Sequence, residues 1–353
     1  MVSACDITVF TFTIISSNIP LLVYWLANKK KNKIPHQWQK VGTLNKIIIY
    51  PLKSGKEYYL TEGDCCKYGL KEIRNDHLFP LRDRCIIVYN ADTKEFTNAK
   101  KNFKLMHVAA ESISSHQIRL TAPNTPELVI KVPLTKSREF FSMYNDEMIR
   151  TKDCGNAAST WITTYLNDGK TYRIGVWPDN IRFGREEIPI KWKKYISLYP
   201  HLKEEYAGMY ADIAGYMATN EASLEDLNER LKQNDVTVTQ RNFRPNFVFD
   251  GMGKYEENEY DWFKIGETVI FRSIKPCTRC VITTVDPETG EKNPHSEPIQ
   301  TLKKYRALKN PTALQLENYS PVFGAYLGII KTGHVKVGDP IYVNKESSSQ
   351  KFI

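Results

Sequence analysis

Short runs of β-branched and aromatic residues recur along most of the chain and predict strands. Turn-forming residues such as Asn90 and Asp92 separate these runs. The predicted strands cover residues 46–50, 85–89, 117–121, 128–132, 172–176, 246–249, 268–271, 281–285 and 335–343.

Two other segments have the apolar spacing of an amphipathic helix. The first begins near residues 153–156, and its apolar face consists of Ala158, Trp161, Ile162, Tyr165 and Leu166. In the second, Leu224, Leu227 and Leu231 share a face, and the spacing of Ser223 and Asp226 indicates a capping box. Many strands, few helices and no alternation of strand and helix argue against a Rossmann sheet. They favour a barrel or sandwich with appended helices.

The amino-terminal end predicts a membrane anchor. Residues 7–27 carry no charge and are followed by Lys29, Lys30, Lys31 and Lys33, and a bilayer-spanning helix needs about 20 mostly apolar residues. Lysines that follow the span place the rest of the chain in the cytosol. A cleaved signal peptide and a buried helix remain the alternatives, although positive charge before the apolar run and a good cleavage site are both missing.

Changes in composition along the chain predict its division into parts. Residues 1–33 form the anchor and its basic flank, and residues 34–40 form a tether. A stretch with little periodicity predicts a linker at 177–189, which separates a region of residues 41–176 from a second region of residues 190–345. Residues 346–353 form a tail.

Composition and charge narrow the class of protein. The 353 residues are 41% hydrophobic and 25% charged, which excludes a disordered or collagen-like polymer. Seven cysteines are too few for a disulfide scaffold, and in the cytosol they would be reduced thiols. The 49 basic and 40 acidic residues give a net charge of +9, which favours anionic ligands or surfaces. This charge is too thinly spread to indicate a nucleic-acid binder.

The motif Cys277-Thr278-Arg279-Cys280 is the sharpest chemical feature. A zinc site would need a second pair of ligands, and His295 stands alone nearby. A thioredoxin-type pair would open a helix, whereas residues 281–285 read as a strand. A single reactive thiolate, its pKa lowered by Arg279 and Lys275, and two buried cysteines that only pack both remain open.

Three other motifs could bind an anion. Arg244 stands between Asn242 and Asn246 and is stiffened by the proline that follows it, so that it could present a fork to a phosphate or carboxylate. Lys53 and Ser54 follow an apolar strand and precede a glycine turn, although the P-loop spacing is missing. Arg82 and Arg84 flank Asp83 at a strand entrance, where Asp83 could simply pair with one of them. No glycine-rich dinucleotide fingerprint, HExxH motif or nucleophile-elbow serine occurs, so a flavin or nicotinamide site of the usual kind is not expected.

Taken in order, these motifs resemble one family. They are the anchor, Tyr50-Pro-Leu-Lys-Ser54, Leu81-Arg-Asp-Arg84, Glu221-Ala-Ser-Leu224, Phe243-Arg-Pro-Asn246, Cys277-Thr-Arg-Cys280, Thr283-Thr-Val-Asp-Pro-Glu-Thr-Gly290 and Gly338-Asp-Pro340. The chain looks like a mitochondrial amidoxime-reducing component, a MOSC-domain molybdenum enzyme, from about residue 41 to 343. The resemblance implies a β-rich α+β fold, in which a MOSC β-barrel accompanies an N-terminal MOSC-type β-barrel region, a few peripheral helices and the anchor.

The resemblance implies a molybdenum cofactor, Mo-molybdopterin, with Cys280 as the protein ligand of the metal. A thiolate suits such a soft metal. The positions that match the family's contacts to the phosphate and pterin are Lys53, Ser54, Arg84, Arg244, Asn246, Thr278, Arg279, Cys280 and Tyr326. One departure concerns Ile213 and Ala214, which stand where family members commonly carry small hydroxylated residues and cannot donate those hydrogen bonds. Cys277 is expected to pack rather than to bind the metal.

The implied reaction is the two-electron reduction of N-hydroxylated compounds (amidoximes, hydroxylamines and N-oxides) to amines or amidines. Electrons would come from NADH through cytochrome b5 reductase and cytochrome b5. Asp212 is a candidate proton donor, with the capping of a turn as its alternative role. We expect a monomer on the mitochondrial outer membrane that faces the cytosol, with the peroxisome and endoplasmic reticulum as alternatives.

Two other functions remain open on the sequence alone. The chain could be a non-redox MOSC protein that carries sulfur or the molybdenum cofactor, with Cys280 holding the cargo. It could also be a basic, membrane-tethered β module that only binds an anionic partner. Metal analysis of the purified protein would separate them.

Overall fold

The computed structural model describes residues 33–132, 139–143, 148–177 and 190–346. The chain divides into a unit of residues 1–38 and a unit of residues 39–353, and the strands and helices of the described residues all belong to the second unit. The predicted anchor and nearly all of the predicted linker and tail lie outside the described residues. Within the described part of the chain, no helix combines the length and the apolar character that crossing a membrane requires.

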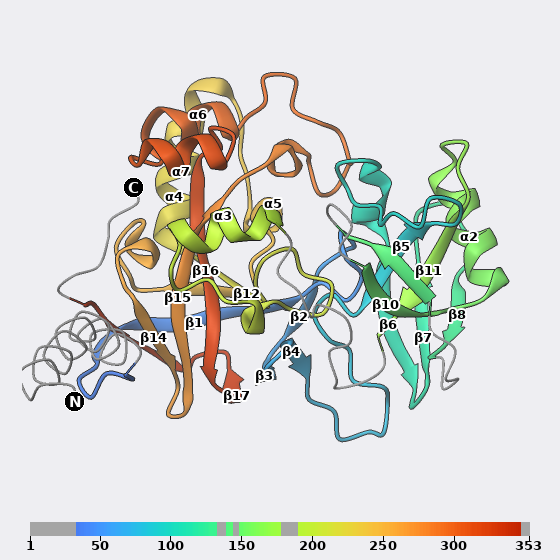
Figure 1. The fold of residues 1–353 in the computed structure, drawn as a ribbon, viewed down its shortest axis with the longest axis horizontal. Coiled ribbons are helices and arrows are strands. Elements are labelled where there is room, and N and C mark those ends of the chain that lie inside the picture. The colour runs from blue at the N-terminus through green and yellow to red at the C-terminus, as the bar shows by residue number, and fades with distance from the viewer. Residues whose placement is uncertain (1–32, 133–138, 144–147, 178–189, 347–353) are drawn as a thin grey trace, which may run out of the picture. The chain divides into compact units, whose positions relative to one another are not determined.

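A closed seven-stranded barrel is the centre of the second unit (Figure 1). In barrel order its strands are β13 (Phe247–Asp250), β12 (Tyr216–Asn220), β16 (Val322–Lys331), β15 (Val269–Thr278), β14 (Trp262–Ile265), β18 (Pro340–Asn344) and β1 (Gln39–Ile49). The pair β12–β13 is parallel and the other neighbours are antiparallel. Strand β1 closes the barrel by pairing with both β13 and β18, although it belongs to the region predicted to precede the second domain.

Aromatic side chains fill much of the barrel core. The rings of Tyr216 and Phe271 meet edge to face with centroids 4.9 Å apart, and Phe247 stacks on Tyr216 at 5.8 Å. Phe249 stacks on Phe263 at 5.6 Å. All five are fully or almost fully buried. Such pairs stabilise a core through their large apolar area and through about 0.5–1.5 kcal/mol of ring-ring attraction each.

Two glycines allow strands to approach closely. A Cβ added to Gly42 in β1 would lie 2.0 Å from the carbonyl oxygen of Asp250 in β13, where the barrel closes. Gly324 in β16 has a φ of +83°, and a Cβ there would lie 2.5 Å from the carbonyl oxygen of Ala218. Both positions therefore require a residue without a side chain.

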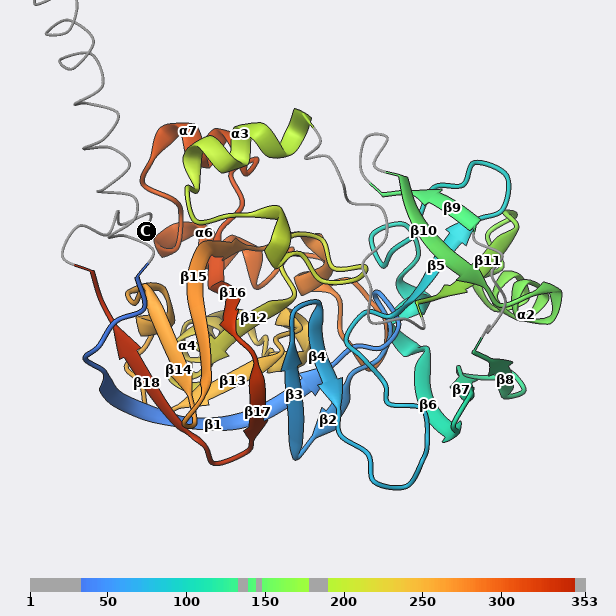
Figure 2. The same ribbon diagram turned by 60° about the horizontal axis from the view of Figure 1, so that its bottom comes forward.

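The second unit also contains three smaller sheets. One has the order β5 (Ile86–Asn90), β11 (Tyr172–Val176), β10 (Met148–Asp153) and β9 (Glu139–Ser142), and another joins β6 (Ala109–Ser114), β7 (Gln117–Thr121) and β8 (Leu128–Lys131). The third joins β17 (Gly333–Lys336), β3 (Glu62–Cys66) and β4 (Gly69–Glu72), as Figure 2 shows, and β2 (Tyr58–Leu60) extends β1. Strand β17, from the later part of the chain, therefore pairs with β3, from the earlier part. The pairing of β1 with β18 in the barrel is of the same kind.

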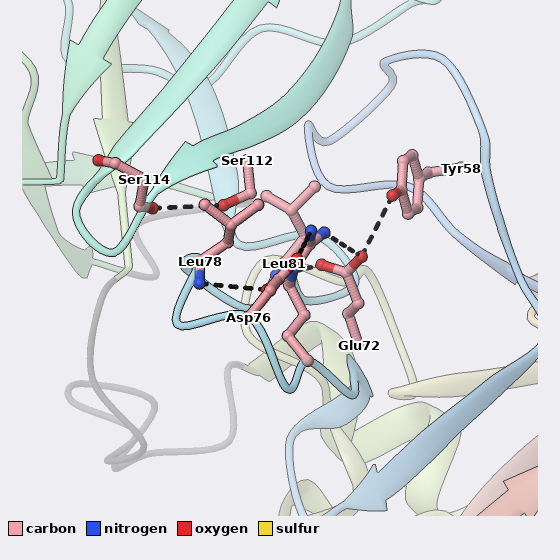
Figure 3. A network of polar contacts seen from close by, with 8 residues as sticks. Tyr58, Glu72, Asp76, Leu78, Leu81, Ser112 and Ser114 are labelled. Atoms are coloured by element: carbon pink, nitrogen blue, oxygen red, sulfur yellow. Dashed lines mark hydrogen bonds and ion pairs between the residues drawn. The ribbon is translucent and has the colours of Figure 1, made fainter.

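A polar network braces the loop that leads from β4 toward Arg84 (Figure 3). Glu72, which is buried, accepts hydrogen bonds from the Tyr58 hydroxyl at 3.1 Å and from the Leu81 backbone at 3.1 Å. Its carboxylate also pairs with Arg74 at 2.8 Å, and Arg74 bridges to Asp76. These bonds fix the chain just before the segment that carries the predicted arginines.

The helices agree in part with the predictions. They are α2 (Asn156–Leu166), α3 (Ile190–Leu198), α4 (Glu221–Leu231), α5 (Gln240–Phe243), α6 (Ile299–Tyr305) and α7 (Pro311–Leu316), with 3₁₀ turns η1 (Phe103–His107), η2 (Glu204–Tyr206), η3 (Lys232–Asn234), η4 (Glu256–Asn258) and η5 (Val281–Thr284). The predicted helices correspond to α2 and α4. The predicted capping box of Ser223 is wrong, because α4 begins at Glu221 and Ser223 bonds instead to Glu257 and Tyr255.

Every predicted strand except one overlaps an observed strand, but the barrel strands β12, β14 and β16 were not predicted. The exception is 281–285, where residues Val281–Thr284 form the turn η5. Predicted strand 335–343 is interrupted by the turn between β17 and β18.

Candidate functional site

Tyr50 lies at the meeting point of three segments that the sequence singled out. It directly follows β1 and is fully buried. The guanidinium carbon of Arg84 lies 5.1 Å from the centroid of its ring, and that of Arg244 lies 4.1 Å from the same centroid. Two arginines that are 160 positions apart in the chain therefore gather on one aromatic side chain.

The backbone of these segments is unusual. Ser54, Arg84 and Arg244 have φ values of +69°, +51° and +57°, in the left-handed region that residues other than glycine, asparagine and aspartate rarely occupy. Such a conformation costs on the order of 1 kcal/mol or more per residue and is common at functional sites. Arg244 is held there as the C-cap of α5, where its backbone N–H bonds to the carbonyl of Gln240.

Arg244 is a partly buried cation without a counter-ion among the described residues. Its Nη2 atom is buried and has no hydrogen-bond partner there, and the same is true of the Tyr50 hydroxyl. Burial lowers the pKa of Arg244 to about 10, and the neighbouring charge of Arg84 also acts to lower it. The guanidinium is still protonated near neutral pH, so an anion bound beside it would be favoured.

Two of the other predicted cations, Arg84 and Lys53, have partners within the protein. Burial acts to lower the pKa of Arg84, but the ion pair with the buried carboxylate of Asp83 outweighs it and raises that pKa. Lys53 is 5% exposed, donates to the carbonyl of Tyr210 at 2.8 Å and pairs with Asp212. Ser54 uses its hydroxyl oxygen to accept a hydrogen bond from the Ala99 backbone at 3.1 Å.

Asp212 connects these cations to the barrel. Its side chain is 52% exposed, and its charge acts on Arg84 and on Tyr326 in β16. Burial raises the pKa of Tyr326 well above its usual value, and contact with Cys277 raises it further. The neighbouring Ile213 packs against an apolar cluster, to which the buried Ala214 belongs. Their side chains therefore pack where the resemblance implies hydroxyl donors.

Cys280 is partly exposed and forms the N-cap of η5, whereas Cys277 is 2% exposed. The residue before Cys280, Arg279, donates through Nη1 to the carbonyl of Phe243 at 2.8 Å. Phe243 in turn directly precedes Arg244. The hydrogen bond between Arg279 and Phe243 therefore forms one junction that supports both the Cys280 thiol and the Arg244 guanidinium.

A second set of bonds supports the same junction from α5. The Asn242 side-chain amide donates to the carbonyls of Thr283 and Val285 in and after η5, at 3.3 and 3.2 Å. Its oxygen accepts from the Thr239 backbone at 2.9 Å, which completes a capping box at the start of α5. Asn242 thus fixes α5, whose C-cap is Arg244, to η5, whose N-cap is Cys280.

Three predicted ligands use their side chains within the protein. Arg279 is 7% exposed and bonds to the carbonyls of Phe323 and Phe243, and Asn246 is 1% exposed and bonds to the backbones of Ile48 and Met217. These two side chains hold strands and loops together. Thr278 donates to Glu317 at 2.7 Å.

Glu317 belongs to a buried ion pair behind the cysteine motif. It contacts the ammonium of Lys275 at 2.7 Å, and Lys275 has no exposed side-chain surface. The rings of Tyr195, Tyr199 and Tyr326 surround this ammonium, with centroids 5.0–5.9 Å from Nζ. Lys275, two residues before Cys277, is therefore held by an ion pair and three aromatic rings. These contacts suit a role in stabilising the fold.

A pocket of about 530 Å³ borders the same turn. It is formed by residues 235–242 and 283–297 and shares Asn242 and Thr283 with the junction. Its carboxylates outnumber its two basic side chains; they are Asp235, Asp286, Glu288, Glu291 and Glu297. Its size and charge suit a small polar or cationic molecule.

The structure therefore brings together Lys53, Arg84, Arg244, Asp212 and Tyr326, and it joins the Cys280 turn to the segment that carries Arg244. The sequence alone did not indicate the central role of Tyr50 or the tie made by Asn242. Tyr50 belongs to the motif that carried the resemblance, but nothing in one sequence shows that a tyrosine lies against two distant arginines.

The donors suit an anionic group that carries a soft metal. Buried guanidinium and ammonium groups favour a phosphate, and a thiol is a ligand for soft metals. The unpartnered Nη2 of Arg244 and hydroxyl of Tyr50 are donors that such a group would satisfy. Among the described residues, no group of three or more His, Cys, Asp or Glu side chains is arranged as a metal site.

Comparison with known proteins identifies two family domains. Residues 41–169 match the MOSC N-terminal beta barrel domain, and residues 205–342 match the MOSC domain. The chain is 35% identical to mitochondrial amidoxime reducing component 2 of Bos taurus and 34% identical to mitochondrial amidoxime-reducing component 1 of Homo sapiens. Each comparison covers 86% of this chain and 84% of the relative.

Proposed function

Because this chain belongs to the mitochondrial amidoxime-reducing component family of MOSC-domain proteins, we propose that it is a molybdenum-cofactor-dependent reductase of N-hydroxylated compounds. The observation that carries the proposal is Arg244, whose buried Nη2 atom has no hydrogen-bond partner among the described residues and whose guanidinium lies against the same ring as that of Arg84. The hydrogen bond between Arg279 and Phe243 joins the residues that precede Cys280 and Arg244, as expected for a site that binds a phosphate and a metal together.

Lys53, Arg84 and Arg244 would hold the phosphate of the cofactor. Each charge-assisted hydrogen bond to it would contribute about 1.5–3 kcal/mol. The Cys280 thiolate would hold the metal. Thr278 lies within the motif at the end of β15, and Tyr326 lies on the neighbouring strand β16, opposite Lys275. When bound, the cofactor would supply the two-electron reduction of the N–O bond.

The residues of this chain would bind the substrate and deliver protons. Asp212 is partly exposed beside Lys53 and remains our candidate for the proton donor to the departing oxygen. The negative charge of the acidic pocket beside η5 would attract the cationic amidine or amine that the reaction forms, although its lining includes neither Cys280 nor Asp212.

Electrons would arrive from NADH through cytochrome b5 reductase and cytochrome b5. The names of the relatives support a mitochondrial location. We propose that residues 1–33 anchor the chain in the outer mitochondrial membrane as a monomer, with the catalytic part in the cytosol.

The test is metal analysis of full-length protein from a host that makes the cofactor. We expect about one molybdenum per chain in the wild type and its loss, or an inactive site, in Cys280→Ala. Cys277→Ala is the matched control, because Cys277 is buried and lies in the same motif, and it should keep the metal.

Activity on a model amidoxime with the cytochrome b5 chain completes the test. Molybdenum without any turnover would favour a non-redox carrier of the cofactor or of sulfur. A wild type free of molybdenum would contradict the proposal and leave a module that binds an anionic partner.

A further inference from the structure

The surroundings of Tyr50 indicate more than a packing role. Its ring is fully buried, and two guanidiniums lie over it, although each comes from a different loop. Arg84 and Arg244 repel each other, and the charge of Arg84 contributes to the lowered pKa of Arg244. An aromatic ring attracts cations to its face, so the ring offsets this repulsion and fixes where each guanidinium can lie.

The hydroxyl of Tyr50 is also unpartnered, because it is buried and has no hydrogen-bond partner among the described residues. Burial raises the pKa of Tyr50, so the phenol remains protonated and can donate at any physiological pH. A buried hydroxyl without a partner is costly, and a ligand that accepts its hydrogen bond would remove that cost.

The unpartnered atoms belong to neighbouring side chains. Nη2 of Arg244 lacks an acceptor in the described part of the chain, and Arg244 is the closer of the two guanidiniums to the Tyr50 ring. Both atoms are donors. A single ligand with several acceptor oxygens and negative charge satisfies the guanidinium and the phenol together.

We propose that Tyr50 is a positioning residue of the anion site, whose ring aligns Arg84 and Arg244 on one phosphate monoester and whose hydroxyl donates a hydrogen bond to it. The inference deepens the proposed function, because the phosphate would be that of the cofactor. It assigns a ligand-binding role to the buried tyrosine that directly follows β1.

The experiment measures the binding of inorganic phosphate to cofactor-free protein by titration calorimetry, in Tyr50→Phe, Tyr50→Leu and Tyr50→Met. Phenylalanine keeps the ring and removes only the hydroxyl, so we expect about a tenfold loss of affinity, since one charge-assisted hydrogen bond is lost. Leucine and methionine remove the aromatic face as well, so we expect a loss of about a hundredfold or more. Tyr59→Leu is the control, because Tyr59 is 52% exposed on β2, and it should bind phosphate like the wild type.

Thermal unfolding of the same variants separates a positioning role of Tyr50 from an effect on stability. If the ring positions the arginines, phosphate affinity should be higher in Tyr50→Phe than in the ring-less variants, and the melting temperatures should not follow the same order. If Tyr50→Leu fails to fold, Tyr50→Met and Tyr50→Phe carry the comparison. The proposal would be overturned if Tyr50→Phe and either Tyr50→Leu or Tyr50→Met bound phosphate as tightly as the wild type. It would also be overturned if the wild type bound no phosphate.

Cofactor content distinguishes this inference from the proposed function. A wild type that contains molybdenum, with Tyr50→Met retaining the full content and phosphate affinity, would refute the role of Tyr50 and leave the function standing. A wild type without molybdenum whose phosphate binding depends on Tyr50 would refute the function and leave the role of Tyr50 standing.

Discussion

At the scale of single residues, the buried pair of Lys275 and Glu317 offers a direct test of how the cysteine motif is supported. Lys275→Met leaves an unpaired buried carboxylate, so we expect the free energy of unfolding to fall by about 3–5 kcal/mol. Adding Glu317→Leu should recover much of this loss, because the remaining charge is removed as well. Chemical denaturation of the single and double variants measures the coupling, and additive losses would contradict a direct pair.

A second residue predicts how stability depends on pH. Glu257 is fully buried, and burial raises its pKa to about 7, although a hydrogen bond from Ser223 and the charge of Arg306 oppose the shift. The folded state therefore holds this proton more tightly than the unfolded state. The contribution of Glu257 to stability is greatest below pH 4.5 and is lost as pH rises toward 7.

We expect Glu257→Gln to remove that dependence. Relative to the variant, the wild type should lose about 3 kcal/mol of unfolding free energy between pH 4.5 and pH 8, as the shifted pKa implies. Denaturant titrations of both proteins across this range measure the difference. Parallel curves would show that folding does not shift the pKa of Glu257.

Single residues also show what one sequence can and cannot predict. Arg84, Arg244 and Lys53 stand out in the sequence because charged residues beside apolar strands are unusual, and the structure gathers them. Asn246 and Arg279 match the family motif equally well, yet their donors bond to backbone carbonyls. The partner of a side chain depends on long-range contacts, which local sequence does not specify.

At the scale of elements, α5 and η5 act as one support for the site. Asn242→Ala would leave the carbonyls of Thr283 and Val285 without their buried donor and would remove the capping box of α5. We expect the free energy of unfolding to fall by about 1–3 kcal/mol and molybdenum content to fall with it. Asn228→Ala is a useful comparison, because Asn228 also ties a helix to a loop, at Val238, but lies in α4. Loss of stability in both variants with loss of metal in Asn242→Ala alone would support this role.

The misassigned element is η5. Residues 281–285 are rich in β-branched side chains and read as a strand, yet the backbone turns because Thr283 and Thr284 bond back to Cys280 and Val281. Their hydroxyls donate to these local carbonyls, and such bonds compete with sheet pairing. Strong helical periodicity, in contrast, is sufficient to predict α2 and α4.

At the scale of the whole second unit, closure of the barrel depends on β1. Gly42→Ala would place a Cβ against the Asp250 carbonyl in the backbone of β13, and backbone cannot move aside as a side chain can. We expect a loss of about 1–3 kcal/mol or more, or failure to fold.

Gly253→Ala is the matched control for barrel closure. There the new Cβ would meet the flexible end of Glu256, which can move. Thermal unfolding of both variants measures the contrast. An equal shift in the two would mean that the close approach of β1 and β13 is not required.

The β-rich class and most strands of the barrel could be predicted from runs of β-branched residues, but the order of the strands could not. Strand β1 lies roughly 200 residues before β13 in the chain, and no local pattern indicates that they pair. The same is true of β17, which joins β3 across an even longer stretch of sequence.

The left-handed backbone at Arg244 has a consequence for laboratory evolution. Glycine at this position would relieve strain of about 1 kcal/mol and remove a guanidinium whose Nη2 has no partner among the described residues, while deleting a side chain that the site requires. A library selected only for survival at high temperature should therefore enrich Arg244→Gly and yield stable but inactive proteins. Selection for heat tolerance and selection for turnover would favour different residues at this position.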